Sequence, residues 1–174
     1  MNYIEQLGEK ALEAKRKIAT ASTGEKNKVL EAIAQVLLEN SDAILAENEK
    51  DITNARDNGI SETMVDRLRL TKERIKGIAD ACMELVNLED PVGEVLQGSV
   101  RPNGMRITKV RVPMGVIGII YEARPNVTAD AFALCFKTGN VVILKGGSDA
   151  IHSNTAIVDC IRRTLEENGI TRDA

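Results

Sequence analysis

Phe136-Lys137-Thr138-Gly139-Asn140-Val141-Val142-Ile143-Leu144-Lys145-Gly146-Gly147-Ser148 is the stretch that decides the fold class of this 174-residue chain. Residues 141–144 form a short aliphatic run, which is typical of a strand covered on both faces. A Gly-Gly turn follows, and residues 154–168 then repeat apolar side chains at helical spacing before Gly169. A strand, a tight turn and an amphipathic helix in this order indicate an α/β unit.

A second apolar run precedes this unit and extends the pattern. Residues 115–121 read as another buried strand, and residues 128–136 read as a helix between the two strands. The order strand, helix, strand, helix predicts a parallel sheet with right-handed crossovers. The fold class is therefore α/β, with part of a Rossmann-like nucleotide-binding sheet in residues 113–174.

A hairpin is predicted just upstream, in residues 98–112. Residues 99–101 and 105–112 flank Pro102-Asn103-Gly104, a strong turn signal. Such a ribbon is either a plain surface hairpin or an arm that reaches another subunit, and the pattern leaves both open. We expect the arm, and with it a homo-oligomer.

Residues 1–97 form the N-terminal helical part. Apolar residues recur at helical spacing in four segments, which we expect to pack antiparallel through short connections. The predicted starts and ends of these helices are marked by Ser22 with Glu25, Ser41 with Asp42, Gly59, Thr71 and Pro91.

The composition excludes several classes of protein. The net charge is −3 and aromatic residues make up 2% of the chain, which argues against a nucleic-acid partner. One histidine and three cysteines without CxxC spacing give neither a zinc site nor a disulfide framework. The N-terminus lacks the apolar core of a signal peptide, and no apolar run is long enough for a membrane span. We therefore expect a soluble, cytoplasmic protein without a metal.

The chemical signal lies in Lys145-Gly146-Gly147-Ser148, directly after the predicted strand. Ligands of open α/β sheets bind at the carboxyl ends of the strands. A lysine there can meet a phosphate or a ribose, and two glycines let the backbone approach closely. The alternative is an ordinary tight connection between strand and helix.

The residues around this turn resemble the aldehyde dehydrogenase superfamily. The strings 136–145, FKTGNVVILK, and 112–118, VPMGVIG, resemble two strands of that superfamily at the expected separation. The strings 121–128, YEARPNVT, and 66–71, DRLRLT, are similar to those of its γ-glutamyl phosphate reductase branch. The resemblance runs from the first helix to Gly169.

This resemblance implies a reaction and a cofactor. The family reduces L-glutamate 5-phosphate to L-glutamate 5-semialdehyde with NADPH in L-proline biosynthesis, through a thioester on a cysteine. Lys145, Gly146, Gly147 and Ser148, with Ile120 and Tyr121, would then bind the cofactor. Many relatives that prefer NAD have glutamate at the position of Ser148, and serine accepts a 2′-phosphate that a carboxylate would repel. The sequence thus favours NADP.

One string departs from the superfamily's pattern. Where aldehyde dehydrogenases carry an asparagine that contributes to the oxyanion hole, this chain has Ala123 or Arg124, depending on the alignment. We expect Arg124 either to bind the substrate's phosphate or to form a structural salt bridge. Asn126 either supplies a donor nearby or caps the following helix.

No catalytic nucleophile is expected among the 174 residues. Cys82, Cys135 and Cys160 lie in apolar stretches, where burial makes a thiol inert, and His152 reads as a surface or capping residue. The family's catalytic cysteine lies much later in its chains, so we expect this chain to be inactive alone. An aldehyde dehydrogenase of another substrate class and a non-catalytic helical interaction module are the alternatives.

Overall fold

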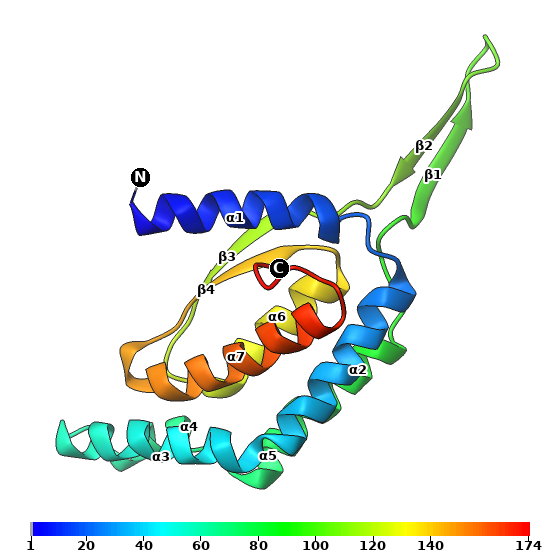
Figure 1. Ribbon diagram of the computed structural model, residues 1–174. Helices are drawn as coiled ribbons and strands as arrows, with labels where there is room; N and C mark the ends of the chain where they lie inside the picture. The colour runs from blue at the N-terminus through cyan, green and yellow to red at the C-terminus, as the bar shows by residue number, and fades with distance from the viewer. Residues whose placement is uncertain (1) are drawn as a thin grey trace.

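The chain folds as helices around a small parallel sheet, with a hairpin projecting from one end (Figure 1). The computed structural model describes residues 2–174. The predicted α/β class is confirmed. The elements in chain order are α1 (Tyr3–Ile18), α2 (Thr23–Glu39), α3 (Ser41–Asp57), α4 (Glu62–Leu68), α5 (Lys72–Asn87), β1 (Val95–Val100), β2 (Arg106–Val110), β3 (Val116–Ile120), α6 (Pro125–Lys137), β4 (Val141–Lys145), a 3-10 turn η1 (Ser148–Ala150) and α7 (Ile151–Glu167).

The helix starts follow the side chains that cap them. The predicted capping box at α2 is present: Ser22 Oγ accepts from Glu25 N at 3.2 Å, and Ser22 N donates to Glu25 Oε2 at 2.8 Å. Thr71 caps α5 through Arg74 N. Ser41 opens α3 as predicted, but no side chain caps that helix.

Two expectations about the helices were wrong. The helices do not all fold back on one another, because only Asn40 separates α2 from α3, and α3 continues away from the end of α2 (Figure 1). The partner that packs along α2 is α5. The short helix α4 was missed, because two buried residues, Val65 and Leu68, are too few to give a periodic pattern.

The two superfamily-like strings meet in the sheet. Strands β3 and β4 pair in parallel, from Val116 opposite Val141 to Ile120 opposite Lys145. Just before them, Gly115 N donates to Asn140 Oδ1 at 2.7 Å, and Val141 N donates to Gly115 O at 2.9 Å. The loop between α6 and β4 is therefore held against the start of β3.

The expectation that both strands are covered on both faces is wrong for residues 2–174. The side chain of Ile120 is 83% exposed, and most other residues of β3 and β4 are only partly buried. Within the described chain the sheet has two strands, so each has an unpaired edge.

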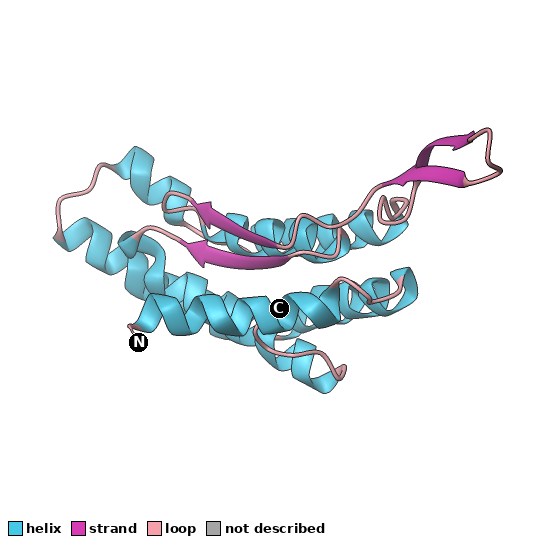
Figure 2. Cartoon of the chain, turned by 90° about the horizontal axis from the view of Figure 1, so that it is seen from above, coloured by secondary structure: helices cyan, strands magenta, loops and turns pink. Residues whose placement is uncertain are grey.

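The hairpin is confirmed. Strands β1 and β2 pair antiparallel, Arg101 N donates to Met105 O, and Gly104 takes the positive φ of 85° that the turn requires. The first strand begins at Val95, before the predicted Ser99. Every residue of both strands is exposed, and the hairpin extends away from the helices (Figure 2).

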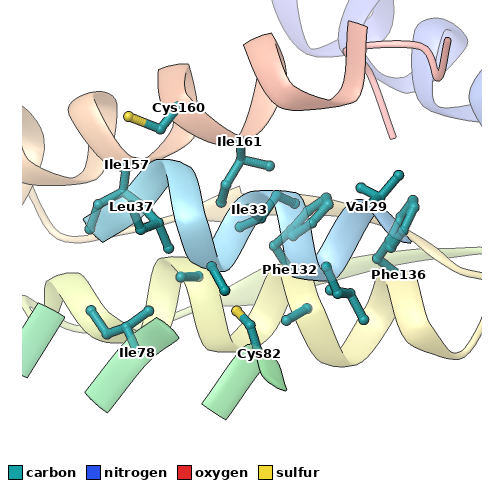
Figure 3. Packing of buried hydrophobic residues seen from close by; sticks show 14 of the residues in the cluster. Val29, Ile33, Leu37, Ile78, Cys82, Phe132, Phe136, Ile157, Cys160 and Ile161 are labelled. Carbon is teal, nitrogen blue, oxygen red and sulfur yellow. The ribbon is translucent and has the colours of Figure 1, made fainter. Parts of the chain in front are cut away.

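The core lies among α2, α5, α6 and α7 (Figure 3). Phe132 and Phe136 stack at a centroid distance of 5.3 Å within it. At its rim, the buried ammonium of Lys26 pairs with Asp90 at 2.5 Å. The helices thus form a packed base for the loops that follow β3 and β4.

Candidate nucleotide-binding and anion-binding site

The predicted cofactor turn lies at the carboxyl end of β4. Lys145 ends the strand, Gly146 and Gly147 form the turn, and Ser148 opens the 3-10 turn that leads into α7. The helix begins at Ile151, three residues before the predicted start. Lys145 and Ser148 are exposed, and within residues 2–174 the Lys145 ammonium has no hydrogen-bond or ion-pair partner.

Packing leaves little space for a Cβ at either glycine of the turn. A Cβ on Gly146 would lie 2.5 Å from Asn154 Nδ2 and 3.0 Å from the hydroxyl of Tyr121. A Cβ on Gly147 would lie 3.3 Å from Ala123 N. The turn therefore lies tightly against the loop after β3: Gly146 has no room for a Cβ on its inner side, and Gly147 has room only if Ala123 shifts.

A hydrogen-bond relay fixes this contact. Thr128 Oγ1 donates to Asn154 Oδ1 at 2.9 Å, so its single proton is used, and the Tyr121 hydroxyl must donate to Thr128 Oγ1 at 2.6 Å. Burial raises the pKa of the Tyr121 phenol, which keeps it protonated and able to donate this bond. Tyr121 N also donates to Lys145 O. Tyr121 thus joins the loop after β3 to the turn after β4.

The start of α7 is held by a buried carboxylate that the sequence analysis missed. Asp51, on α3, accepts from His152 N at 3.1 Å, from Ser153 N at 2.8 Å and from Ser153 Oγ at 2.5 Å. Its position contained a signal, because Asp51 shares a helical face with the buried Ile44 and Ile52. A polar residue on a buried face needs a specific partner.

Asn48 extends this network to the segment between α4 and α5. Its Nδ2 donates to Ser153 Oγ and to Leu68 O, and its Oδ1 accepts from Leu70 N at 2.7 Å. The cofactor turn and the segment around Leu70 are therefore braced by the same two residues of α3, Asn48 and Asp51.

Arg124 and Asn126 lie where β3 leads into α6. Arg124 is exposed and forms no salt bridge within residues 2–174. Asn126 does not cap α6, because it lies inside the helix and donates to Asp130 Oδ2 at 3.1 Å. The phosphate-binding role of Arg124 stays a prediction.

Both residues line a pocket of about 330 Å³, which we call the arginine pocket. It brings together the two strings that resemble the γ-glutamyl phosphate reductase branch, although they are separated by about fifty residues in the sequence. The residues that line it are Asp66, Arg67, Arg69, Leu70, Arg74, Arg124, Pro125 and Asn126.

The three thiols are buried, as expected. Burial raises the pKa of Cys82 to about 11 and also raises the pKa of Cys135 and of Cys160. A thiol in this state is a poor nucleophile. His152 lies at the surface, where its Nδ1 is 3.7 Å from Glu47 Oε2.

Neither a metal cluster nor a membrane helix is found in residues 2–174. No three His, Cys, Asp or Glu side chains are grouped to hold an ion. No helix has the length and hydropathy to cross a bilayer.

Comparison with known proteins identifies the class. The model of the aldehyde dehydrogenase family matches residues 2–171. The chain therefore belongs to the aldehyde dehydrogenase family. The NADP complex of a glyceraldehyde-3-phosphate dehydrogenase from Methanocaldococcus jannaschii shares the fold at 17% identity, with a TM-score of 0.69 over 97% of this chain and 34% of that one.

Two solved structures confirm the more specific resemblance. The γ-glutamyl phosphate reductase from Thermotoga maritima is 45% identical, with a TM-score of 0.97 over 99% of this chain and 42% of that chain. The enzyme of the same name from Saccharomyces cerevisiae is 29% identical, with a TM-score of 0.93 over 99% of this chain and 45% of that chain. The present chain thus spans less than half the length of either.

Proposed function

We propose that this chain is the nucleotide-binding part of a γ-glutamyl phosphate reductase, which reduces L-glutamate 5-phosphate to L-glutamate 5-semialdehyde and phosphate in L-proline biosynthesis. The observation that carries the proposal is the 45% identity to the Thermotoga maritima reductase over 99% of the chain. The arginine pocket supports it, because an acyl phosphate carries an anionic group that ordinary aldehydes lack.

The cofactor is NADPH, held at the carboxyl ends of β3 and β4. Lys145, Gly146, Gly147 and Ser148 form one side of this site, and Ile120 and Tyr121 form the other. These residues fit a dinucleotide, since the ammonium of Lys145 is unpaired within residues 2–174 and the glycine turn offers bare backbone. The turn would hold the adenosine end of the cofactor, and a bound NADPH would supply the hydride from its nicotinamide end.

The preference for the 2′-phosphorylated cofactor rests on charge. Ser148 is exposed and neutral at the position where a glutamate would repel a 2′-phosphate. Asp149 is the adjacent carboxylate, and its Oδ1 lies 3.4 Å from Ser148 Oγ. Lys145 must therefore offset this carboxylate as well as pair with the phosphate.

The remaining functions are divided between this chain and the rest of a longer polypeptide. Arg124 binds the substrate's phosphate, and Asn126 supplies a donor beside it. The nucleophilic cysteine lies outside residues 1–174, since the three thiols here are buried. The exposed hairpin, β1 and β2, joins subunits of a cytoplasmic homo-oligomer.

Cofactor choice tests the proposal with the 174-residue chain. Titration with NADPH and NADH, followed by nucleotide fluorescence, should show tighter binding of NADPH. Ser148→Glu should reverse the preference, and Lys145→Gln should weaken NADPH binding by about 10-fold or more, as expected for a lost charge-assisted bond. Thr155→Glu, which adds the same charge at an exposed position of α7, is the control. Equal binding of both nucleotides by the unmodified chain would contradict the cofactor assignment.

The reaction itself is tested with a longer polypeptide that contains this chain and the catalytic region. NADPH oxidation that depends on the acyl phosphate, with release of inorganic phosphate, is the expected result. Oxidation of simple aldehydes with NAD and no reaction with the acyl phosphate would place the enzyme in another substrate class of the family.

A further inference from the structure

We propose that the arginine pocket is a binding site for a phosphate dianion, and that Arg67 and Arg69 bind it together with Arg124. In the complete enzyme the dianion is the phosphoryl group of the substrate, an assignment that rests on the proposed function. The phosphate site itself rests on this chain alone. Neither Arg67 nor Arg69 is marked as a binding residue by its sequence context alone.

The charge of the pocket is the first argument. Its lining contains four arginines and one aspartate, which gives a local net charge of 4 − 1 = +3. The whole chain carries −3, so this concentration of positive charge runs against the overall balance. Several guanidinium groups around one concavity are the arrangement that binds phosphate groups in proteins.

The free guanidinium groups are the second argument. The one aspartate, Asp66, is paired with Arg74 at 3.4 Å. Within residues 2–174, neither Arg69 nor Arg124 has a side-chain hydrogen bond or an ion pair, and Arg67 has only a 3.8 Å contact with Met64 Sδ. Three cations at one pocket repel each other, and an anion between them would remove that repulsion.

Arg74 gives the pocket its shape instead of binding the anion. Its Nη1 donates to Asp66 O at 2.7 Å and to Arg69 O at 2.5 Å, which ties the segment between α4 and α5 to the start of α5. Leu70 N is held from the other side by Asn48. The backbone that carries Arg67 and Arg69 is therefore fixed before any ligand binds, which lowers the entropic cost of binding.

The start of α6 contributes a further favourable field. Pro125 and Asn126, the first two residues of this 13-residue helix, line the pocket beside Arg124. The amino end of a helix carries a partial positive charge, which adds to the attraction of the arginines. The helix terminus supplements the side chains and would not make a site without them.

The test is a titration of the 174-residue chain with inorganic phosphate at low ionic strength, without nucleotide, followed by calorimetry and by amide chemical shifts. We expect saturable binding, with shifts concentrated at residues 66–70 and 124–127. Arg69→Gln and Arg67→Gln should each weaken binding by about 10-fold, the effect of one lost charge-assisted contact. Arg16→Gln, at an exposed position of α1 outside the pocket, should leave it unchanged.

Each outcome decides the inference. The absence of phosphate binding, or equal phosphate binding by Arg69→Gln and Arg16→Gln, would overturn the inference. Urea unfolding is the control for folding. If Arg67→Gln and Arg69→Gln keep the urea midpoint of the unmodified chain, their loss of phosphate affinity is not due to unfolding. Phosphate binding that depends on Arg69, in a longer polypeptide that does not reduce the acyl phosphate, would keep the site and reject the proposed function. Reduction of the acyl phosphate with an unchanged KM in Arg69→Gln would do the reverse.

Discussion

Replacement of Asp51 by alanine should destabilise the chain more than any exposed substitution on the same helix. Asp51 is 1% exposed and accepts three hydrogen bonds at the start of α7. In Asp51→Ala, the Ser153 amide and hydroxyl lose their acceptor in a buried place, at about 1–3 kcal/mol for each unsatisfied donor. His152 N lies nearer the surface, where water can replace the carboxylate. The expected loss is therefore about 3 kcal/mol or more.

Urea unfolding, followed by far-UV circular dichroism, measures this loss. With a slope of about 1–3 kcal/mol/M for a small protein, a loss of about 3 kcal/mol should lower the midpoint by about 1–3 M. Glu49→Ala is the matched control, because Glu49 is an exposed acid on the same helix and should change stability by less than about 0.5 kcal/mol. If Asp51→Ala and Glu49→Ala unfold at the same urea concentration, Asp51 does not hold the start of α7.

Three further predictions concern the pH dependence, the turn and the thiols. Burial tends to raise the pKa of Asp90, but hydrogen bonds from Lys26, Val92 N and Thr23 and the charge of Lys26 together hold it below its usual value. The pKa of Asp90 is thus lower in the folded chain than in the unfolded chain, so the ionised carboxylate stabilises the fold at neutral pH and this contribution is lost as the pH falls below about 4. The urea midpoint should therefore fall over this pH range. In Asp90→Asn this part of the pH dependence should be absent. Gly146→Ala should lower both thermal stability and NADPH affinity, because its Cβ would lie 2.5 Å from Asn154 Nδ2; Gly8→Ala, with open space around it, is the control. A thiol reagent should modify none of the three cysteines quickly in the native chain and all of them in urea, and rapid native labelling would contradict their burial.

The elements of the fold that could be predicted are those defined by neighbours in the sequence. Capping residues such as Ser22 and Thr71, the Pro102-Asn103-Gly104 turn and the aliphatic runs of β3 and β4 act within a few residues of themselves. The direction of α3 relative to α2 was not predictable in this way. It depends on which apolar faces meet in the core, and the spacing of apolar residues specifies a face without specifying its partner.

The residues of the candidate site also differ in whether their partners are near or far in the sequence. The turn from Lys145 to Ser148 was found because strand, glycines and helix are consecutive. Asp51 was missed because its partners, His152 and Ser153, lie about a hundred residues away. Arg69 was missed as a site residue for a similar reason, since its string showed a family resemblance but gave no indication that it meets Arg124.

The loop after β3 links the two halves of the candidate site. Tyr121 is fixed against the cofactor turn by its bonds to Lys145 O and Thr128, and Arg124 follows only three residues later at the edge of the arginine pocket. Three residues of extended chain span at most about 10 Å, so the backbone of Arg124 lies close to the turn that would hold the nucleotide. In the proposed function this turn holds the adenosine end of NADPH, so the short connection places the loop that carries Arg124 beside the cofactor and does not by itself set the position of the hydride. The buried relay of Tyr121, Thr128 and Asn154 therefore joins the loop that carries Arg124 to the turn that we propose holds the nucleotide.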